Sequence, residues 1–449
     1  MTFLKLQDIP KTIKNSFHNP LIRNIMIVGA VTLLIKVIAF YKEMMIAGNF
    51  GLSELLDTFF IALLVPSFVQ SVFISSITSI FIPNYVIEMK EGGNISSLQS
   101  VIFLISIGIS TFTVILAYLS TDFFLDLIYP GHTSSYYQLI KDQLFIIMPC
   151  LFFWGITSVL GGLMEISNKF FLRSISTFFP IATMIFFLLF LKEQIGPMVL
   201  AYGTLVGNAI ALLYFLFVTI KFKILSIGRP IINSNTKFML RQLPPKIFSS
   251  FFSAMNNYVD QFFAAALIIG SISALNYGIR LPSFGISIVI MALGSVLLPH
   301  FSKLVNENLD EAYNHLFKIL KWVVGISTII VIIGIFMSDY IIELIFERGA
   351  FTHEDTLKVS LIQKITLIYI PFYLSTLIIV KFLTSINKNK FMAWISFFNL
   401  FINLILNFIL VKYYEVYGLA LSTTLVLIIS SCFYFGYTYK QYKLLPKFN

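Results

Sequence analysis

Two long apolar runs lie head to tail between Lys36 and Pro83, separated by the short turn Asn49–Phe50–Gly51. A run of about 20 apolar residues is the length that a helix needs to cross a bilayer. The first run contains Lys42 and Glu43 as well as Lys36, and Asp57 opens the second. Each ionisable side chain in such a run costs roughly 2.5–3.5 kcal/mol to insert, so it usually faces a polar cavity. The stretch therefore predicts a membrane hairpin with charges of both signs on its inner side.

Similar apolar runs fill most of the 449-residue chain, which is 58% hydrophobic and only 12% charged. A soluble domain would carry about 25% charged residues. Only helices and closed barrels satisfy their backbone polar groups in lipid, and these runs are too long for barrel strands. The sequence therefore predicts an all-α, polytopic membrane protein. The basic residues behind its net charge of +10 lie in short loops, which favours a role in orienting the chain over nucleic-acid binding.

The sequence lacks the motifs of covalent chemistry. It has no P-loop, no glycine-rich nucleotide fingerprint, no HExxH pair and no nucleophile elbow. Cys150 and Cys432 lie within apolar runs and have neither disulfide nor metal spacing. We therefore expect no enzyme activity, no catalytic residue, no metal site and no cofactor. Energy for transport would come from a gradient of Na+ or H+, from the membrane potential, or from the substrate gradient.

The apolar runs predict twelve membrane-spanning helices. Lysine and arginine gather in alternate loops, so the positive-inside rule predicts that both termini are cytoplasmic and that residues 1–20 form a short cytoplasmic amphipathic segment. The predicted spans lie near residues 25–48, 55–83, 98–119, 138–164, 171–191, 196–220, 247–269, 273–299, 314–337, 358–383, 390–411 and 416–437.

The two halves of the chain repeat each other. Val65-Pro66-Ser67-Phe68 recurs as Leu281-Pro282-Ser283-Phe284, and Pro83 recurs as Pro299. Three further matches agree at offsets between 215 and 222 residues, including Tyr202-Gly203 with Tyr417-Gly418. Six spans in each half predict two parallel repeats that enclose a midplane cavity. We expect an N-lobe at residues 1–220, a basic cytoplasmic linker at 221–246 in which Gly228, Pro230, Pro244 and Pro245 act as breakers, and a C-lobe at 247–449.

Charged residues inside the spans suggest an anion site. Lys36 and Glu43 share a helix face, whereas Lys42 and Glu43 can also extend to the interface from a helix end. Asn276 and Arg280 share a face one turn before Pro282. A guanidinium at that depth suits bidentate phosphate binding, although an ion pair with Asp260 or Asp57 is the alternative.

Uncharged polar residues suggest a second site. Asn256 and Asp260 share a face of the seventh span, and Asn399, Asn403 and Asn407 form an i, i+4, i+8 stripe on the eleventh. Carboxylate and amide oxygens can hold a small hard cation, and a buried aspartate can hold a proton. Hydrogen bonding between helices accounts for the same residues equally well.

The motifs of the first hairpin resemble the MurJ (MviN) lipid II flippase family of the multidrug/oligosaccharidyl-lipid/polysaccharide exporter superfamily. They are Lys36-x-x-Ala-Phe-x-Lys-Glu43, Phe50-Gly51, Asp57-x-Phe-Phe-x-Ala62-x-x-x-Pro66 and Phe81-x-Pro83. The segments ALNYGIRLPSFGISIVIMALGSVLLP (274–299) and LIFERGAFTHEDT (344–356) also resemble that family. The resemblance implies a two-lobed bacterial inner-membrane protein that flips an undecaprenyl-pyrophosphate-linked saccharide. It implies that Lys36, Lys42 and Arg280 take the places of cationic cavity residues and Asp57 that of the family aspartate.

The chain departs from the family pattern in three places. Lysine replaces the usual arginine at Lys36 and Lys42, which keeps the charge but loses the planar fork. After Pro66 the family tends to carry Asn and Arg, whereas this chain has Ser67 and Gln70. The chain also ends after twelve predicted spans, without the final helix pair of the family.

From these observations we expect a flippase that works by alternating access as a monomer among membrane lipids. We predict Lys36, Lys42, Asp57, Asn276 and Arg280 as substrate-binding residues, and Asp260, Asn256, Asn399 and Asn403 as cation-coupling residues. The substrate is lipid II or a related cell-envelope precursor. The alternatives are an exopolysaccharide or O-antigen unit flippase, a multidrug or cation antiporter of the same superfamily, and a membrane-embedded glycosyltransferase or polymerase.

Overall fold

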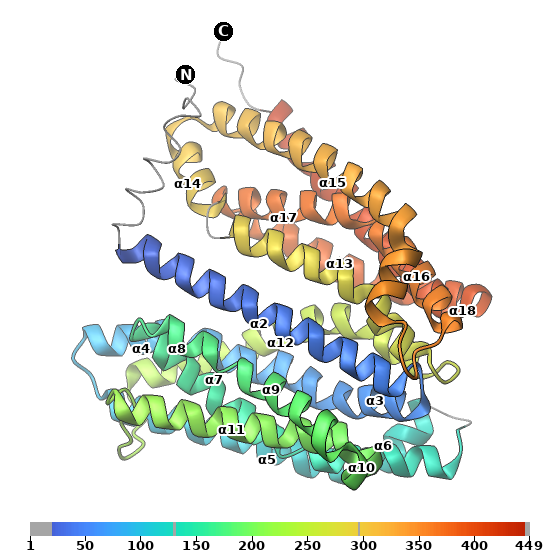
Figure 1. The fold of residues 1–449 in the computed structure, drawn as a ribbon. Coiled ribbons are helices and arrows are strands. Elements are labelled where there is room, and N and C mark those ends of the chain that lie inside the picture. Colours follow the sequence, from blue (N-terminus) through green and yellow to red (C-terminus); the bar gives the residue numbers. More distant parts are fainter. Residues whose placement is uncertain (1–19, 129–131, 295–296, 445–449) are drawn as a thin grey trace. The chain divides into compact units, whose positions relative to one another are not determined.

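The computed structural model describes residues 20–128, 132–294 and 297–444, and in these ranges the chain is helical with no strand (Figure 1). The predicted amphipathic segment at residues 1–20 lies almost wholly outside the described residues. The chain divides into two compact units. Unit 1 comprises the described residues of Met1–Ile46, Val65–Thr121 and Lys141–Phe248, and unit 2 comprises those of Ala47–Leu64, Asp122–Ile140 and Ser249–Asn449. The predicted lobe boundaries stay a prediction.

Five of the described helices pass from one unit to the other along the chain. They are α2 (Pro20–Phe50), α3 (Glu54–Val69), α5 (Ile95–Ile128), α6 (Ser134–Ile147) and α12 (Ser234–Ala265). The α-helices wholly within unit 1 are α4 (Ser75–Lys90), α7 (Cys150–Ile166), α8 (Phe170–Ile175), α9 (Phe178–Phe186), α10 (Lys192–Ile195) and α11 (Val199–Lys221). Those wholly within unit 2 are α13 (Ser271–Gly294), α14 (Leu297–Glu307), α15 (Leu309–Phe346), α16 (His353–Leu367), α17 (Ile370–Ser385) and α18 (Asn389–Lys443).

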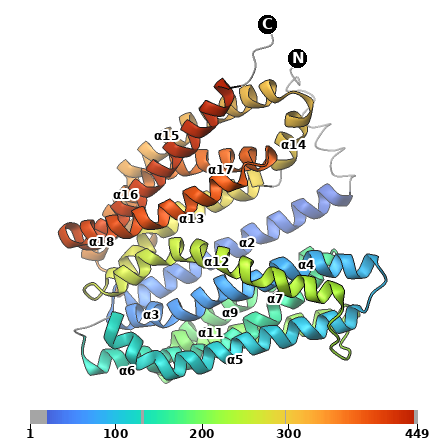
Figure 2. The same cartoon turned by 180° about the vertical axis from the view of Figure 1, so that it is seen from behind.

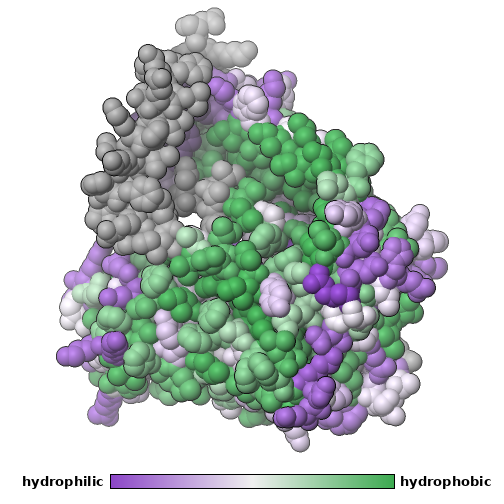
Figure 3. All heavy atoms as spheres, viewed as in Figure 1, coloured by the Kyte–Doolittle hydropathy of each residue, from purple (hydrophilic) through white to green (hydrophobic). Residues whose placement is uncertain are grey.

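Each unit has its own apolar core. In unit 1, buried side chains of α4, α5, α7, α11 and the start of α12 pack together, among them Phe81, Ile102, Leu160, Val218 and Met239. In unit 2, the core joins α14, α15, α17 and α18, which Figure 2 shows from behind, through residues such as Phe301, Tyr313, Phe382 and Tyr434. The outward face of α15 is apolar as well (Figure 3), with Phe336 84% and Trp322 64% exposed. Such a face suits contact with lipid, which needs no covering by protein.

Six helices of the described chain are long and apolar enough to cross a membrane, or seven if the bent pair α16 and α17 is one span. Two of these are long segments that reverse direction. In Lys390–Lys443, the Ser422 hydroxyl donates to Asn403 Oδ1 at 3.0 Å, although 19 residues of straight helix would separate them by about 28 Å. The reversal lies at Glu415, which has φ +50°. In Phe170–Lys221, a Cβ on Gly207 would lie 2.7 Å from Pro180 Cα, so this segment also folds back.

The predicted class, an all-α polytopic membrane protein, is confirmed, and the number twelve stays a prediction. The two reversals agree with the separation of the predicted spans 171–191 from 196–220 and 390–411 from 416–437. One local expectation is wrong: α12 begins at Ser234 and continues through Pro244 and Pro245. The two prolines remove the partners of the carbonyls of Leu240 and Arg241, and these residues are half-buried and exposed, so water can replace the lost bonds. Gly228 and Pro230 do lie in a non-helical stretch.

Candidate functional site

A polar cluster forms around Asp260 of α12 in unit 2. Asn407 and Asn403 of α18 both donate to Asp260 Oδ1, at 2.7 and 3.1 Å. The Thr423 hydroxyl donates to the other carboxylate oxygen. Asn403 in turn accepts from the hydroxyl of Ser422 at 3.0 Å. The reversal in α18 is what brings the asparagines of its first arm to the threonine of its second.

A cavity of about 600 Å³ lies beside this cluster, within unit 2. All four predicted cation-coupling residues, Asp260, Asn256, Asn399 and Asn403, line it, together with Thr423. Asn399 donates to Ser430 at 2.9 Å, and Asn256 donates to the carbonyl of Phe252 at 3.0 Å. The structure therefore brings the four residues to one cavity, where Asn403 alone of the three predicted asparagines bonds to the Asp260 carboxylate. Their role in coupling stays a prediction. A sequence signal for Thr423 exists, since Ser422-Thr423-Thr424 is a polar run in an otherwise apolar arm.

Asp57 makes a different set of contacts, at the beginning of α13. Its carboxylate accepts from the backbone N–H of Gly270 at 2.5 Å and of Ser273 at 3.0 Å, and from the Ser273 hydroxyl at 2.5 Å. Lys358 supplies a positive charge close by. The first N–H groups of a helix lack partners within it and attract negative charge, so the 2% exposed Asp57 caps α13 from another helix.

Glycines allow the chain after α15 to turn tightly against the end of α2. The N–H of Ala350 donates to the Gly48 carbonyl at 2.8 Å. Gly349 has φ +57°, and a Cβ there would lie 2.2 Å from the oxygen of Gly48. Beyond this turn, the Thr356 hydroxyl donates to Glu347 at 2.7 Å and holds the pKa of that carboxyl below its ordinary value. The 344–356 motif thus forms an ordered turn against residues 48–51.

We expect Gly349→Ala to lower the stability of the protein more than Gly92→Ala does. Both glycines have positive φ, +57° and +66°, so either alanine pays about 1–2 kcal/mol for a left-handed backbone. A Cβ on Gly92 meets nothing within 4 Å, whereas one on Gly349 meets the Gly48 carbonyl. Thermal unfolding of the two variants in detergent measures the difference. Equal unfolding midpoints would show that the turn accommodates the added Cβ of Gly349→Ala with no further loss of stability.

The predicted substrate-binding residues are divided between the units. Asn276 and Arg280 lie on α13 in unit 2, both half-buried, and Asn276 donates to the Ile272 carbonyl at 2.9 Å. Neither lines the 600 Å³ cavity, which instead borders the neighbouring face of α13 through Leu275, Ile279 and Ser283. Both carboxylates accept from the hydroxyl, amide and N–H donors described above, and the alternative ion pair of Arg280 with Asp57 or Asp260 stays a prediction.

Lys36 and Lys42 lie on α2 in unit 1. Lys36 is half-buried. Lys42 forms an ion pair with the adjacent Glu43 at 2.8 Å, and the two side chains are 22% and 11% exposed. Because Glu43 neutralises part of the charge of Lys42, less of that charge is available to attract an anionic substrate. The contribution of Lys36 and Lys42 to substrate binding stays a prediction.

Comparison with known proteins places the chain in a family. Residues 46–448 match the family model described as "Lipid II flippase MurJ". The chain belongs to the MurJ family. A probable lipid II flippase MurJ of Buchnera aphidicola subsp. Baizongia pistaciae is 27% identical over 427 residues, which cover 90% of this chain and 81% of that protein. One from Helicobacter pylori strain 26695 is 26% identical over 422 residues, covering 89% and 90%.

Solved structures agree with this family. "Lipid II flippase MurJ, inward closed conformation" matches with a TM-score of 0.76 and 25% identity, covering 92% of this chain and 87% of that one. An inward-facing MATE family multidrug resistance transporter of the MOP superfamily matches with a TM-score of 0.73, covering 93% and 98%, but at 12% identity it shows the fold alone. The predicted family is confirmed. This MurJ family chain is a multi-pass membrane transporter and not an enzyme.

Proposed function

We propose that this MurJ family protein flips lipid II across the bacterial inner membrane by alternating access. The family match over residues 46–448 carries this proposal, and Arg280 in the family-like segment of α13 supports it. Loop charges support an orientation with both termini in the cytoplasm. The protein would work as a monomer. Likeness to MATE transporters is a likeness of fold and does not favour drug export.

Within this function, Arg280 and Asn276 of α13 and Lys36 and Lys42 of α2 are the proposed contacts of the pyrophosphate. A guanidinium matches phosphate oxygens in a planar, two-bond geometry that an ammonium lacks. Asp57 is better suited to positioning, since it holds the first turn of the helix that carries Arg280 seven residues after Ser273. The Asp260 cluster would bind the coupling cation, Na+ or H+, because its polar groups surround one carboxylate at the edge of the cavity.

We expect the protein to rescue growth of bacteria depleted of their own lipid II flippase. The expected result follows from a family match that spans nearly the whole chain. Growth after depletion measures it, and Arg280→Ala expressed to the same level is the negative control. No rescue by a well-expressed protein would contradict lipid II as the substrate. It would favour another lipid-linked glycan, in keeping with Gln70 where the family tends to carry a cation.

A further inference from the structure

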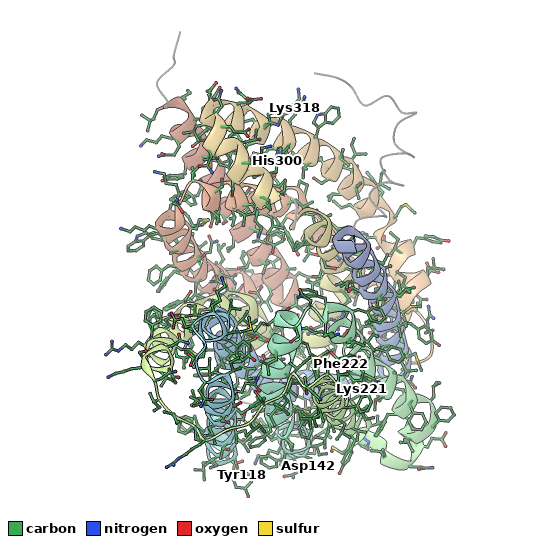
Figure 4. The ribbon with its side chains drawn as sticks, turned by 90° about the vertical axis from the view of Figure 1, so that its left-hand side faces the viewer. Tyr118, Asp142, Lys221, Phe222, His300 and Lys318 are labelled. Atoms are coloured by element: carbon green, nitrogen blue, oxygen red, sulfur yellow. The ribbon has the colours of Figure 1, made fainter. Side chains whose placement is uncertain are left out.

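The segment Lys221–Phe248, here called the basic segment, runs from the last residue of α11 through the first half of α12, within unit 1. It begins at Lys221 and Phe222, labelled in Figure 4. No aspartate or glutamate occurs between Glu193 and Asp260. The segment carries six exposed cations, and none of them forms an ion pair within residues 20–128, 132–294 and 297–444. They are Lys221, Lys223, Arg229, Lys237, Arg241 and Lys246.

Three side chains of α5 hold the backbone of this segment in place. The hydroxyl of Ser100 donates to the Gly228 carbonyl at 2.7 Å and accepts from the Gly228 N–H at 3.0 Å. Ser97 makes the same pair of bonds with Ile231, at 3.1 and 2.7 Å. Gln99 donates to the Ile224 carbonyl at 3.2 Å and accepts from the Ser226 N–H at 2.9 Å. Backbone groups of Ile224, Ser226, Gly228 and Ile231 thus bond to α5. The side chains of Ile227 and Arg229, between them, are exposed.

A buried carboxylate holds the middle of the segment, where α12 begins. Glu88 of α4 is 2% exposed and accepts from the amides of Asn233 and Asn235 at 2.6 and 2.7 Å. Asn235 also donates to the carbonyl of Asn84 at 3.0 Å. The Glu88 carboxylate therefore bonds to neutral amides and not to the cations of the segment.

The hydrogen bonds from Ser97, Gln99, Ser100 and Glu88, here called the clamp, hold the segment with large apolar side chains exposed. Ile227, Ile232 and Ile231 are 73%, 66% and 53% exposed. A role of the cations in orienting the chain would not require these isoleucines, since loop charge alone suffices for that. Exposed apolar side chains among unpaired cations are typical of segments that lie in the interface of an anionic bilayer. Phe217 and Ile220, also exposed, end the apolar helix α11 just before the segment begins, so the lipid-facing surface is continuous with it.

We propose that the basic segment binds anionic phospholipids, with Ile227, Ile231 and Ile232 inserted among the acyl chains and the lysines and arginines against the headgroup phosphates. Ser97, Gln99, Ser100 and Glu88 present this surface by holding its backbone. The binding is a property of unit 1 and does not depend on which lipid-linked substrate the protein flips.

A fluorescent label at position 227 tests the proposal. Cys150 is buried and Cys432 is exposed, so Cys432→Ser leaves Ile227→Cys as the accessible thiol for an environment-sensitive dye. The protein is placed in nanodiscs of phosphatidylcholine alone, or mixed with an equal amount of phosphatidylglycerol. We expect quenching of the dye by lipid-borne quenchers, more strongly with phosphatidylglycerol, and weaker when salt is raised. A dye that is equally open to water in every mixture would overturn the proposal.

Matched charge variants give the second readout. The test variant carries Lys221→Gln, Lys223→Gln, Arg229→Gln and Lys237→Gln, and the control carries Lys303→Gln, Lys318→Gln, Lys321→Gln and Lys412→Gln on unit 2. Titration of phosphatidylglycerol into the detergent-solubilised protein measures affinity. Each surface cation contributes about a fivefold change, so the test variant should bind more than 100-fold more weakly and the control as before. Equal affinities would overturn the proposal.

Release of the clamp provides a variant that changes no charge. Ser97→Ala with Ser100→Ala removes the bonds to Ile231 and Gly228, so the dye at position 227 should lose its protection by lipid. If instead the dye is protected in cell membranes but not in nanodiscs, the surface is covered by a protein partner and the lipid proposal is wrong. None of these readouts uses flipping, so they can fail while the transport function stands.

Discussion

Replacing Arg280 with alanine is expected to lower the rate of lipid II flipping by about 100-fold. A charged two-bond contact with phosphate contributes roughly 3 kcal/mol, and each 1.36 kcal/mol is a factor of ten in rate. Arg280 lies half-buried on α13, whose first turn is held by Asp57. Flipping by the purified variant in vesicles that contain lipid II measures the loss.

Two controls separate a binding role from a structural one. Arg280→Lys keeps the charge but loses the fork, so its rate should lie between those of the native protein and of Arg280→Ala. Lys412→Ala removes an exposed cation of unit 2 and should flip at the native rate. All three variants should elute as a single species with a native unfolding midpoint. An unfolded Arg280→Ala would show a structural role, and full activity of a folded one would remove Arg280 from the substrate site.

The sequence predicts the class and the family better than it predicts contacts. Long apolar runs specify membrane helices because lipid leaves the backbone no other partner. Part of the cluster around Asp260 can be predicted, because the spacing of Asn403 and Asn407 places both on one face of a helix. Thr423 lies 163 residues from Asp260, and its position depends on the reversal at Glu415.

The contacts of Asp57 could not be predicted. Gly270 lies 213 residues further along the chain, and the atoms that meet the carboxylate there are mostly backbone N–H groups, which carry no residue-type signal. At the prolines of α12 the error is the opposite one, because the sequence predicts a feature that the structure does not have. Pro244 and Pro245 predict a break, yet the helix continues because the carbonyls that lose their partners belong to residues open to solvent.

Replacing Asp260 with asparagine is expected to remove the response of flipping to an ion gradient while the protein stays folded. Asparagine has the shape of aspartate, so Asn403, Asn407 and Thr423 keep a partner of the same size, but the negative charge that would attract a cation is gone. Flipping is measured in vesicles with a Na+ gradient, a pH gradient or a membrane potential imposed separately. The native protein should respond to one of the two ion gradients, and the variant should respond to neither.

A control variant that loses the same charge elsewhere shows whether the effect is specific to Asp260. Asp310 lies exposed near the beginning of α15 in the same unit, so Asp310→Asn changes the net charge equally without touching the cavity. It should keep the native gradient response. If Asp260→Asn also keeps it, the Asp260 cluster only joins α12 to α18 by hydrogen bonds. A response to the membrane potential alone, unchanged in both variants, would place the driving force on the charge of the substrate and not on a bound cation.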